Sequence, residues 1–412
     1  MDKCFYAENR KSLFSNLIEG SIAVVFSGGE SWRSADDYFP YFANRNFLYL
    51  TGINQMEAVL IGSCNEETLY IPPPDAHFER WNGERVKQDR AAEISGVKKI
   101  LHTCEFNRQL DFKLNSGSVD AVYLPIYKHR AEQPDGPEHK LTKYIQDRYP
   151  HIVIKNLFPL VKKQRLIKKP CEVDALRQAS AITKEGILAM MRAAKPGISE
   201  RELKAEFLYA IMKHGAEGPA ANPIISVGKN NFCIHYHDTK GVAMDGDFVL
   251  NDVGVPYDNL VTDVSRGWPI NGRFSDRQKQ LYQAAYEVSN YMFGIIKPGM
   301  PMGDVDKIIR EKIYKYLEDI GLCKTWDDVG KYMWHGGAHH IGYDVHDVVA
   351  VNNATLLTPG MVFCVDIGIY VEEWGIGFRL EDNCLVTQDG CENLSKDIPR
   401  SIEDIEAVMR SA

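Results

Sequence analysis

The sequence lacks the patterns that mark several common classes of protein. The 412-residue chain has no run of about 18 apolar residues, the length that a helix needs to cross a membrane. Its N-terminus leads into polar residues without an apolar signal core, and its nine cysteines contain no CxxC pair. We therefore expect a cytoplasmic protein with reduced thiols and no membrane partner, not a secreted disulfide framework or a zinc ribbon.

An excess of basic charge is also missing. Lys and Arg number 48 against 56 Asp and Glu, which gives a formal net charge of −8. A general nucleic-acid binder normally carries a basic excess or a basic stripe. The longest basic cluster, at residues 162–169, is short and precedes a proline, so a solvated linker explains it better. The sequence therefore predicts no nucleic-acid partner.

What remains is an ordinary globular composition, with 44% hydrophobic and 25% charged residues. Apolar runs bounded by turn residues predict strands at residues 22–27, 48–50, 58–61 and 121–124. A helical stretch at 87–95 lies between them. We expect a small α/β domain over residues 1–160 and a larger domain over residues 161–412.

The larger domain contains an internal repeat. A helix that begins near Asp174 ends at a Lys-Pro-Gly tripeptide, residues 195–197, and a helix over 276–295 ends at a second one, residues 297–299. Each tripeptide is followed by a second amphipathic helix, of which the first has a capping box from Ser199 to Glu202.

Each half then leads into an apolar strand that contains one aspartate. The strands at 248–254 and 362–368 align residue for residue, with Asp252 opposite Asp366. A shared helix stop and a shared strand aspartate favour a duplication over chance. We expect the two halves to pack around a pseudo-twofold axis.

A second carboxylate follows each strand aspartate: Asp263 in the first half and Glu381 in the second. A buried carboxylate is costly unless it is paired, for example with Arg266 or Arg379, or bound to a cation. Four carboxylates that converge from equivalent halves repel one another unless cations neutralise them. The pattern predicts two divalent metals, and oxygen ligands favour Mn, Mg or Fe over a thiolate-type zinc site.

Histidines gather at two places near these strands. His335, His339, His340 and His346 fall within a glycine-containing segment between the two acidic strands. A lone histidine is usually an ordinary surface or core residue, but such a cluster is better explained as a site. His235 precedes the first acidic strand, and a chance placement in a loop remains an alternative for it.

Several motifs, in this order, resemble the aminopeptidase P and prolidase family, whose members have the pita-bread metallopeptidase fold. The motifs are Asn-Pro-Ile (222–224), Ile-His-Tyr (234–236), Asp-Val-Gly (252–254), Thr-Asp-Val-Ser-Arg (262–266), His-Gly-Gly-Ala-His (335–339), Asp-Val-His-Asp (344–347), Pro-Gly-Met (359–361) and Gly-Phe-Arg-Leu-Glu-Asp (377–382). N-terminal stretches at 47–60 and 79–83 resemble the family's non-catalytic domain. The resemblance covers essentially the whole chain.

The resemblance implies a dinuclear site, usually holding Mn, with the ligands Asp252, Asp263, His339, Asp366 and Glu381. It implies substrate contacts and proton handling at His235 and His346, and further contributions from His335 and Arg379 beside the substrate and the bridging Glu381. It also implies a homo-oligomer, dimer or tetramer, in which Trp81, with Asp36 or Asp37, reaches the pocket of a neighbouring subunit.

One motif departs from the family. Where the family normally has Val-Glu-Pro-Gly, residues 365–368 read Val-Asp-Ile-Gly. In the family this carboxylate both binds a metal and shuttles a proton, and Asp366 is one methylene shorter than glutamate. Since catalysis is sensitive to displacements of about 1 Å, we expect an active or weakened catalytic site rather than a dead one.

The leading hypothesis is a Mn-dependent Xaa-Pro aminopeptidase, a hydrolase that releases the N-terminal residue from peptides with proline second. A prolidase confined to dipeptides is one alternative. A metal-free, creatinase-type amidinohydrolase is another, although its carboxylates would go unneutralised. A non-enzymatic peptide-binding protein is the third.

Overall fold

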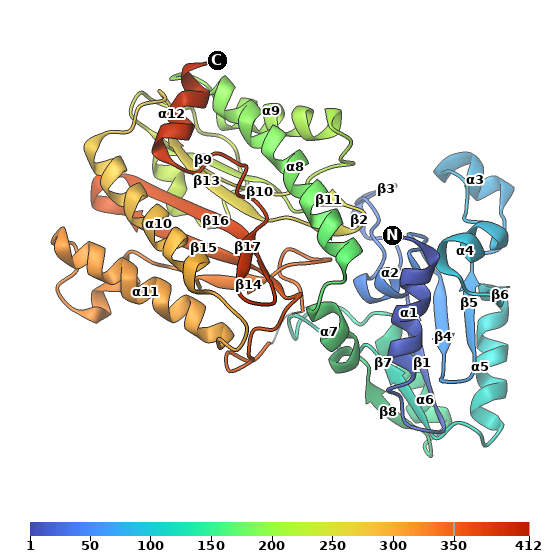
Figure 1. Cartoon of the computed structure of the whole chain (residues 1–412). Coiled ribbons are helices and arrows are strands. Elements are labelled where there is room, and N and C mark those ends of the chain that lie inside the picture. The colour runs from blue at the N-terminus through green and yellow to red at the C-terminus, as the bar shows by residue number, and fades with distance from the viewer. Residues whose placement is uncertain (349–350, 412) are drawn as a thin grey trace. The chain divides into compact units, whose positions relative to one another are not determined.

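The computed structural model describes residues 1–348 and 351–411, which form two compact units, Met1–Arg165 and Leu166–Ala412 (Figure 1). The boundary expected after residue 160 falls inside helix α7 (Phe158–Leu166), close to the division between the units. In the described part of the chain, no helix is both long enough and apolar enough to cross a membrane.

The N-terminal unit is an α/β domain built on a six-stranded sheet. The strand order is β6-β5-β4-β1-β7-β8, with antiparallel pairs in the middle (β1 with β4, β4 with β5) and parallel pairs toward both edges. Its elements are α1 (Lys3–Phe14), β1 (Ser21–Phe26), β2 (Trp32–Ser34), β3 (Asp37–Tyr38), α2 (Arg45–Thr51), β4 (Val59–Gly62), β5 (Glu67–Ile71), α3 (Ala76–Asn82), α4 (Gln88–Ser95), β6 (Ile100–His102), α5 (Phe106–Asn115), β7 (Ala121–Leu124), α6 (Pro137–Arg148), β8 (Val153–Asn156) and α7.

One predicted strand of this unit is wrong. Residues 48–50 lie in helix α2, not in a strand. Asn44 caps the helix by accepting the backbone N–H of Asn46, and Gly52 ends it in the left-handed region at φ 69°. Every residue of the helix after Arg45 is buried, so its apolar run has no amphipathic period that could distinguish it from a strand.

The described part of the C-terminal unit has two helix pairs, two larger antiparallel sheets, ordered β13-β10-β9 and β14-β15-β16-β17, and the two-stranded antiparallel sheet β11-β12. Figure 1 shows the pair α8 and α9 and the pair α10 and α11 at separate places beside these strands. The elements are α8 (Pro170–Ala193), α9 (Glu200–Lys213), β9 (Ile224–Val227), β10 (Phe248–Val253), β11 (Pro256–Tyr257), β12 (Leu260–Val261), β13 (Val264–Pro269), α10 (Asp276–Ile295), α11 (Met302–Asp319), β14 (Ala338–His340), β15 (Val362–Val371), β16 (Ile376–Val386), β17 (Cys391–Asn393) and α12 (Ile402–Arg410).

The order of these elements confirms the predicted duplication. A helix pair precedes an antiparallel sheet in each half, of three strands in the first and four in the second, and the glycines of the two Lys-Pro-Gly stops, Gly197 and Gly299, have φ of 91° and 87°. The capping box forms as predicted, because Ser199 and Glu202 each accept the backbone N–H of the other. The fold is the α/β domain followed by the duplicated pita-bread domain that the sequence predicted.

Buried polar side chains join the two halves of the larger unit. Asn231 donates both to the carbonyl oxygen of Phe248 in the first half and to that of Gly377 in the second. Arg266 on β13 donates to the carbonyl oxygen of Glu381 on β16 at 2.8 Å. These bonds hold β13 beside β16, and so bring the two acidic strands together.

Candidate metal centre

The alternation of side chains along β15 separates a polar face from the core. Val365, Ile367 and Ile369 point into the main hydrophobic core, whereas Cys364 and Asp366 point to the opposite face. This period of two explains how one apolar strand can carry metal-binding groups on one side only.

The neighbouring strands add their polar residues to the same face. In the antiparallel register, His339 of β14 stands opposite Cys364, and Glu381 of β16 stands opposite Asp366. Residues directly opposite each other have their Cβ atoms about 4.5–5.5 Å apart. The sheet register alone therefore places a histidine, a thiol and two carboxylates side by side.

Three of these groups, His339, Cys364 and Glu381, form a compact cluster with Asp263. One potential ligand atom each from Asp263, His339, Cys364 and Glu381 lie within 4.8 Å of one another. Nε2 of His339 is 3.1 Å from Oε1 of Glu381 and 3.6 Å from Oδ2 of Asp263. The other oxygen of Glu381 accepts the hydroxyl of Ser265 at 2.9 Å. We call these four residues the metal group.

Asp366 lies beside the metal group and is held by a histidine. Its Oδ2 is 3.0 Å from Nδ1 of His335, and within the described part of the chain its buried Oδ1 has no hydrogen-bond partner. Burial favours a raised pKa for Asp366, but the charges of His335 and Arg379 outweigh it and lower that pKa. Gly368, opposite Arg379, leaves the space that the His335 ring occupies.

Asp252 is held by an arginine. Its Oδ2 accepts from Nη2 of Arg379 at 3.0 Å, and the same guanidinium donates to the hydroxyl of Tyr370 and to the carbonyl oxygen of Ile234. The ion pair with Arg379, expected from the sequence as an alternative to a bound cation, is therefore present at Asp252. It leaves Oδ1 of Asp252 outside the pair, and the carboxylate also lines the cavity described below.

The two second carboxylates do not occupy equivalent positions, which corrects one step of the duplication argument. In the first half the residue opposite the strand aspartate is Ser265, whereas in the second half it is Glu381. Asp263 lies two residues earlier, just before β13. The halves therefore share the positions of Asp252 and Asp366, while Asp263 and Glu381 reach the centre from different registers.

The electrostatics of the centre fit cations. Burial, then the charges of Glu381 and Asp252, raises the pKa of Asp263 far above its ordinary value, and burial with the charge of Asp366 raises that of Glu381. Both shifts reflect negative charge without enough compensation. The Oδ1 atom of Asp366 and the carboxylate oxygens around Nε2 of His339 are atoms that could bind a divalent cation.

A cavity of about 300 Å³ opens onto Asp252 and Asp263. His235, His237 and His346 line it, so the structure brings both predicted substrate histidines to the acidic strands. The rings of His346 and His339 meet edge to face, with centroids 4.4 Å apart. Burial, with the neighbouring His339, lowers the pKa of His346 to about 4, which keeps this imidazole neutral near pH 7.

Some residues of the site were not predicted from the sequence. Cys364 belongs to the metal group, Ser265 donates to Glu381, and Tyr370 links His335 to Arg379. A usable signal was present for two of them. Cys364 and Tyr370 lie two residues before and four residues after Asp366, on the same face of a strand.

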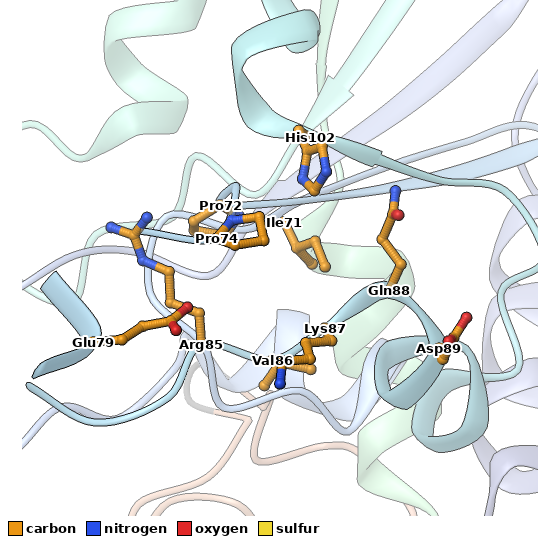
Figure 2. Close-up of a pocket in the computed structure, with 10 residues that line it drawn as sticks. All are labelled: Ile71, Pro72, Pro74, Glu79, Arg85, Val86, Lys87, Gln88, Asp89 and His102. Carbon is orange, nitrogen blue, oxygen red and sulfur yellow. The ribbon is translucent and has the colours of Figure 1, made fainter. Parts of the chain in front are cut away.

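Trp81 belongs to the N-terminal unit, on α3, and is 76% exposed. A second cavity, of about 190 Å³, lies in that unit between the end of β5 and the start of α4 (Figure 2). Its lining mixes both signs of charge, including Glu79, Arg85 and Asp89, and Arg85 donates to the carbonyl oxygen of Pro73. It has no cluster of metal-binding groups like that on β15 in the described residues.

Comparison with known proteins agrees with this architecture. Residues 174–388 match metallopeptidase family M24, and residues 6–123 match the aminopeptidase P N-terminal domain. The Xaa-Pro aminopeptidase of Escherichia coli strain K12 is 32% identical over 435 aligned residues, which cover 99% of this chain and 98% of that protein.

Solved structures match the chain along its whole length. A structure from Bacillus anthracis is 34% identical, covering 100% of this chain and 99% of that one, with a TM-score of 0.97. Aminopeptidase P from E. coli with the inhibitor Pro-Leu is 30% identical with the same coverage and a TM-score of 0.90, and another structure of that enzyme is zinc-substituted and holds product. With the carboxylates and His339 gathered on β15 and β16, these matches show that the chain is a peptidase of metallopeptidase family M24, with an aminopeptidase P N-terminal domain before its peptidase domain.

Proposed function

We propose that this peptidase is an Xaa-Pro aminopeptidase that holds two divalent metal ions, for which Mn is the first choice. It would release the N-terminal residue from peptides with proline in the second position. The observation that carries the proposal is the convergence of Asp252, Asp263, Asp366, Glu381 and His339 beside one cavity lined by His235 and His346. The Escherichia coli relative named above carries this activity in its name.

We assign the metal ions to those five side chains. When bound, they would supply a hydroxide nucleophile at neutral pH and polarise the scissile carbonyl. The chain's own contribution begins with orientation. Arg379 fixes the carboxylate of Asp252, Ser265 fixes one oxygen of Glu381, and His335 fixes one oxygen of Asp366, so each carboxylate keeps a defined direction for its other oxygen.

Proton transfer is assigned to Asp366. Its Oδ2 is held by His335 beside the metal group, so the carboxylate is positioned to take the proton of the attacking water and return it to the leaving nitrogen. A proline nitrogen has no N–H before cleavage, so it must gain this proton to leave. His346, which is neutral near pH 7, lines the cavity together with His235, where both can donate hydrogen bonds to the substrate carbonyl oxygen as negative charge develops on it.

We further propose a cytoplasmic homo-oligomer, dimer or tetramer, in which Trp81 contacts the substrate pocket of a neighbouring subunit. The indole of Trp81 is 76% exposed on a short helix, so it is available for such a contact. Light scattering tests the oligomeric state. Trp81→Ala should raise KM for long peptides in the oligomer, and an unchanged KM would contradict this role.

The central experiment combines metal analysis with peptide cleavage. The purified protein is assayed for bound Mn, Fe, Co and Zn, then offered Xaa-Pro-Yaa peptides, Xaa-Pro dipeptides and matched Xaa-Ala-Yaa peptides with added Mn. We expect metal binding and cleavage of Xaa-Pro-Yaa. Cleavage of dipeptides alone would identify a prolidase instead. A protein that holds no metal and cannot be reconstituted would refute the proposal.

A further inference from the structure

Cys364 occupies a position that the assigned ligand set leaves unused. It stands directly opposite His339 in the β14–β15 register and two residues before Asp366 on the same face of β15. Its sulfur belongs to the metal group with Asp263, His339 and Glu381. The side chain is fully buried, so neither solvent nor a surface role accounts for it.

The other contacts of the thiol lie within the same cluster. Nδ2 of Asn383 lies 3.5 Å from Sγ, and Sγ lies 4.0 Å from the carbonyl oxygen of Asp263. The carboxylate of Glu381 also faces the thiol, and the amide of Asn383 is already engaged by the backbone of Asp263. An ion held by Asp263, His339 and Glu381 would therefore lie against the sulfur and replace its contact with Glu381.

We infer that Cys364 is a ligand of the ion bound by Asp263, His339 and Glu381, and that its sulfur directs that position toward Zn²⁺, Co²⁺ or Fe²⁺ in preference to Mn²⁺. The inference rests on the metal centre of the proposed function. The donor set becomes one imidazole nitrogen, one sulfur and two carboxylate oxygens. Imidazole and thiolate suit zinc and related late metals, whereas manganese prefers oxygen ligands throughout.

This donor set changes the expectation drawn from the sequence. The carboxylates alone favoured a hard ion, and that argument holds for the position beside Asp252 and Asp366. At the position beside His339, the thiol gives up its proton to solvent as the ion binds and adds a soft, anionic donor. The two positions should therefore differ in metal preference within one centre.

Cobalt tests the inference without using activity. Co²⁺ bound to a thiolate shows an intense near-ultraviolet sulfur-to-metal charge-transfer band, which carboxylate and imidazole ligands do not produce. The metal-free full-length protein is titrated with Co²⁺ and its absorption and cobalt content are measured. We expect the band to saturate with the first tightly bound ion, and to vanish in Cys364→Ser while the weak visible cobalt bands remain.

The matched control is Cys384→Ser. Cys384 is equally buried, but it stands opposite Phe363 on the core face, so its loss should leave the cobalt spectrum unchanged. A band that persists in Cys364→Ser overturns the inference, because it would come from another thiol. If Cys364→Ser does not fold, as judged by circular dichroism, the wild-type spectrum decides, since bound cobalt without the band overturns the inference.

The same titration separates this inference from the proposed function. Cobalt that binds without a charge-transfer band removes Cys364 from the ligands but leaves the metal centre intact. A protein that binds no cobalt refutes the metal centre itself, and the inference with it. A competition experiment adds a second readout, in which Cys364→Ser should lower the affinity for Zn²⁺ at least about tenfold and change that for Mn²⁺ much less. An equal change for both ions would also overturn the inference.

Discussion

Asp366 and Glu381 stand directly opposite each other in the β15–β16 ladder, each held by a partner from outside that pair. His335 binds one oxygen of Asp366, and Ser265 binds one oxygen of Glu381. Like charges at opposing positions of a sheet are destabilising. This placement is therefore costly in the bare protein, and it becomes favourable when cations are shared between the two side chains.

The length of the side chain at position 366 sets the first prediction. We expect Asp366→Glu to raise kcat on Xaa-Pro-Yaa peptides, by up to about 100-fold, since that is the cost of a displacement of about 1 Å. Steady-state kinetics with saturating metal measure the change. Asp389→Glu, in an exposed turn, controls for added volume and should have no effect. An unchanged or lower rate would show that the site has adapted to aspartate.

The guanidinium of Arg379 sets the second prediction. It donates at once to Asp252, Tyr370 and the backbone of Ile234, next to His235. Lysine cannot reproduce this planar fork. Arg379→Lys should lower kcat/KM and metal affinity by about 10- to 100-fold, with normal circular dichroism. The exposed Arg410→Lys serves as the control, and full activity in Arg379→Lys would contradict the orienting role.

Metal removal should destabilise the C-terminal unit. Without ions the buried carboxylates repel one another, and an ion at 100 times its Kd adds about 2.7 kcal/mol of stability. Scanning calorimetry with Mn²⁺ and with a chelator should show a shift of about 5–10 °C in the corresponding transition. Asp263→Asn should abolish most of the shift, while Asp389→Asn should keep it. Equal transitions with and without metal would argue against ions at this site.

A buried ion pair behind the site predicts a pH effect on stability. Asp382 lies between Arg266 and Arg400, at 2.7 and 3.0 Å. Burial opposes its ionisation, but the two arginines and the hydroxyl of Ser395 outweigh burial and lower its pKa. Because the folded pKa is below the unfolded one, its stabilisation is complete above about pH 4, the unfolded value, and is lost as pH falls toward the folded value.

Asp382→Asn should therefore cost about 3–5 kcal/mol in unfolding free energy at neutral pH, since it leaves two buried cations without their partner. Denaturant unfolding across the range from pH 7 to 2 measures this cost. The difference from wild type should stay constant down to about pH 4 and shrink below it. The exposed variant Asp389→Asn should show little difference at any pH. A difference that grows with acidity would contradict the assignment.

Local patterns predicted part of the fold, chiefly the two helix pairs and the two acidic strands of the larger unit. Helix α10 and the capping box at Ser199 follow from spacing and capping alone. The error at residues 48–50 has a physical reason, because a short helix whose residues after Arg45 are all buried has no period to reveal it. The aspartates at 252 and 366 were found for the opposite reason, since a carboxylate within an apolar strand stands out against its neighbours.

Local sequence patterns predicted only part of the metal centre. The sequence singled out the acidic and histidine residues, but it aligned Asp263 with Glu381, which differ by two positions in register. It also treated Cys364 as one reduced thiol among nine. Its neighbour His339 is on a different strand and distant in the chain, so no local spacing connects them.

By itself, the sequence determined which side chains share a face of each strand, because alternation along a strand depends only on residue number. It also determined the two-half plan, through repeated stops and repeated aspartates. Only the tertiary structure decided which atoms meet: His335 on Asp366, Arg379 on Asp252 and Cys364 beside His339. Those contacts depend on the register between strands far apart in the chain, which is set by the packing of the whole unit and not by any local pattern.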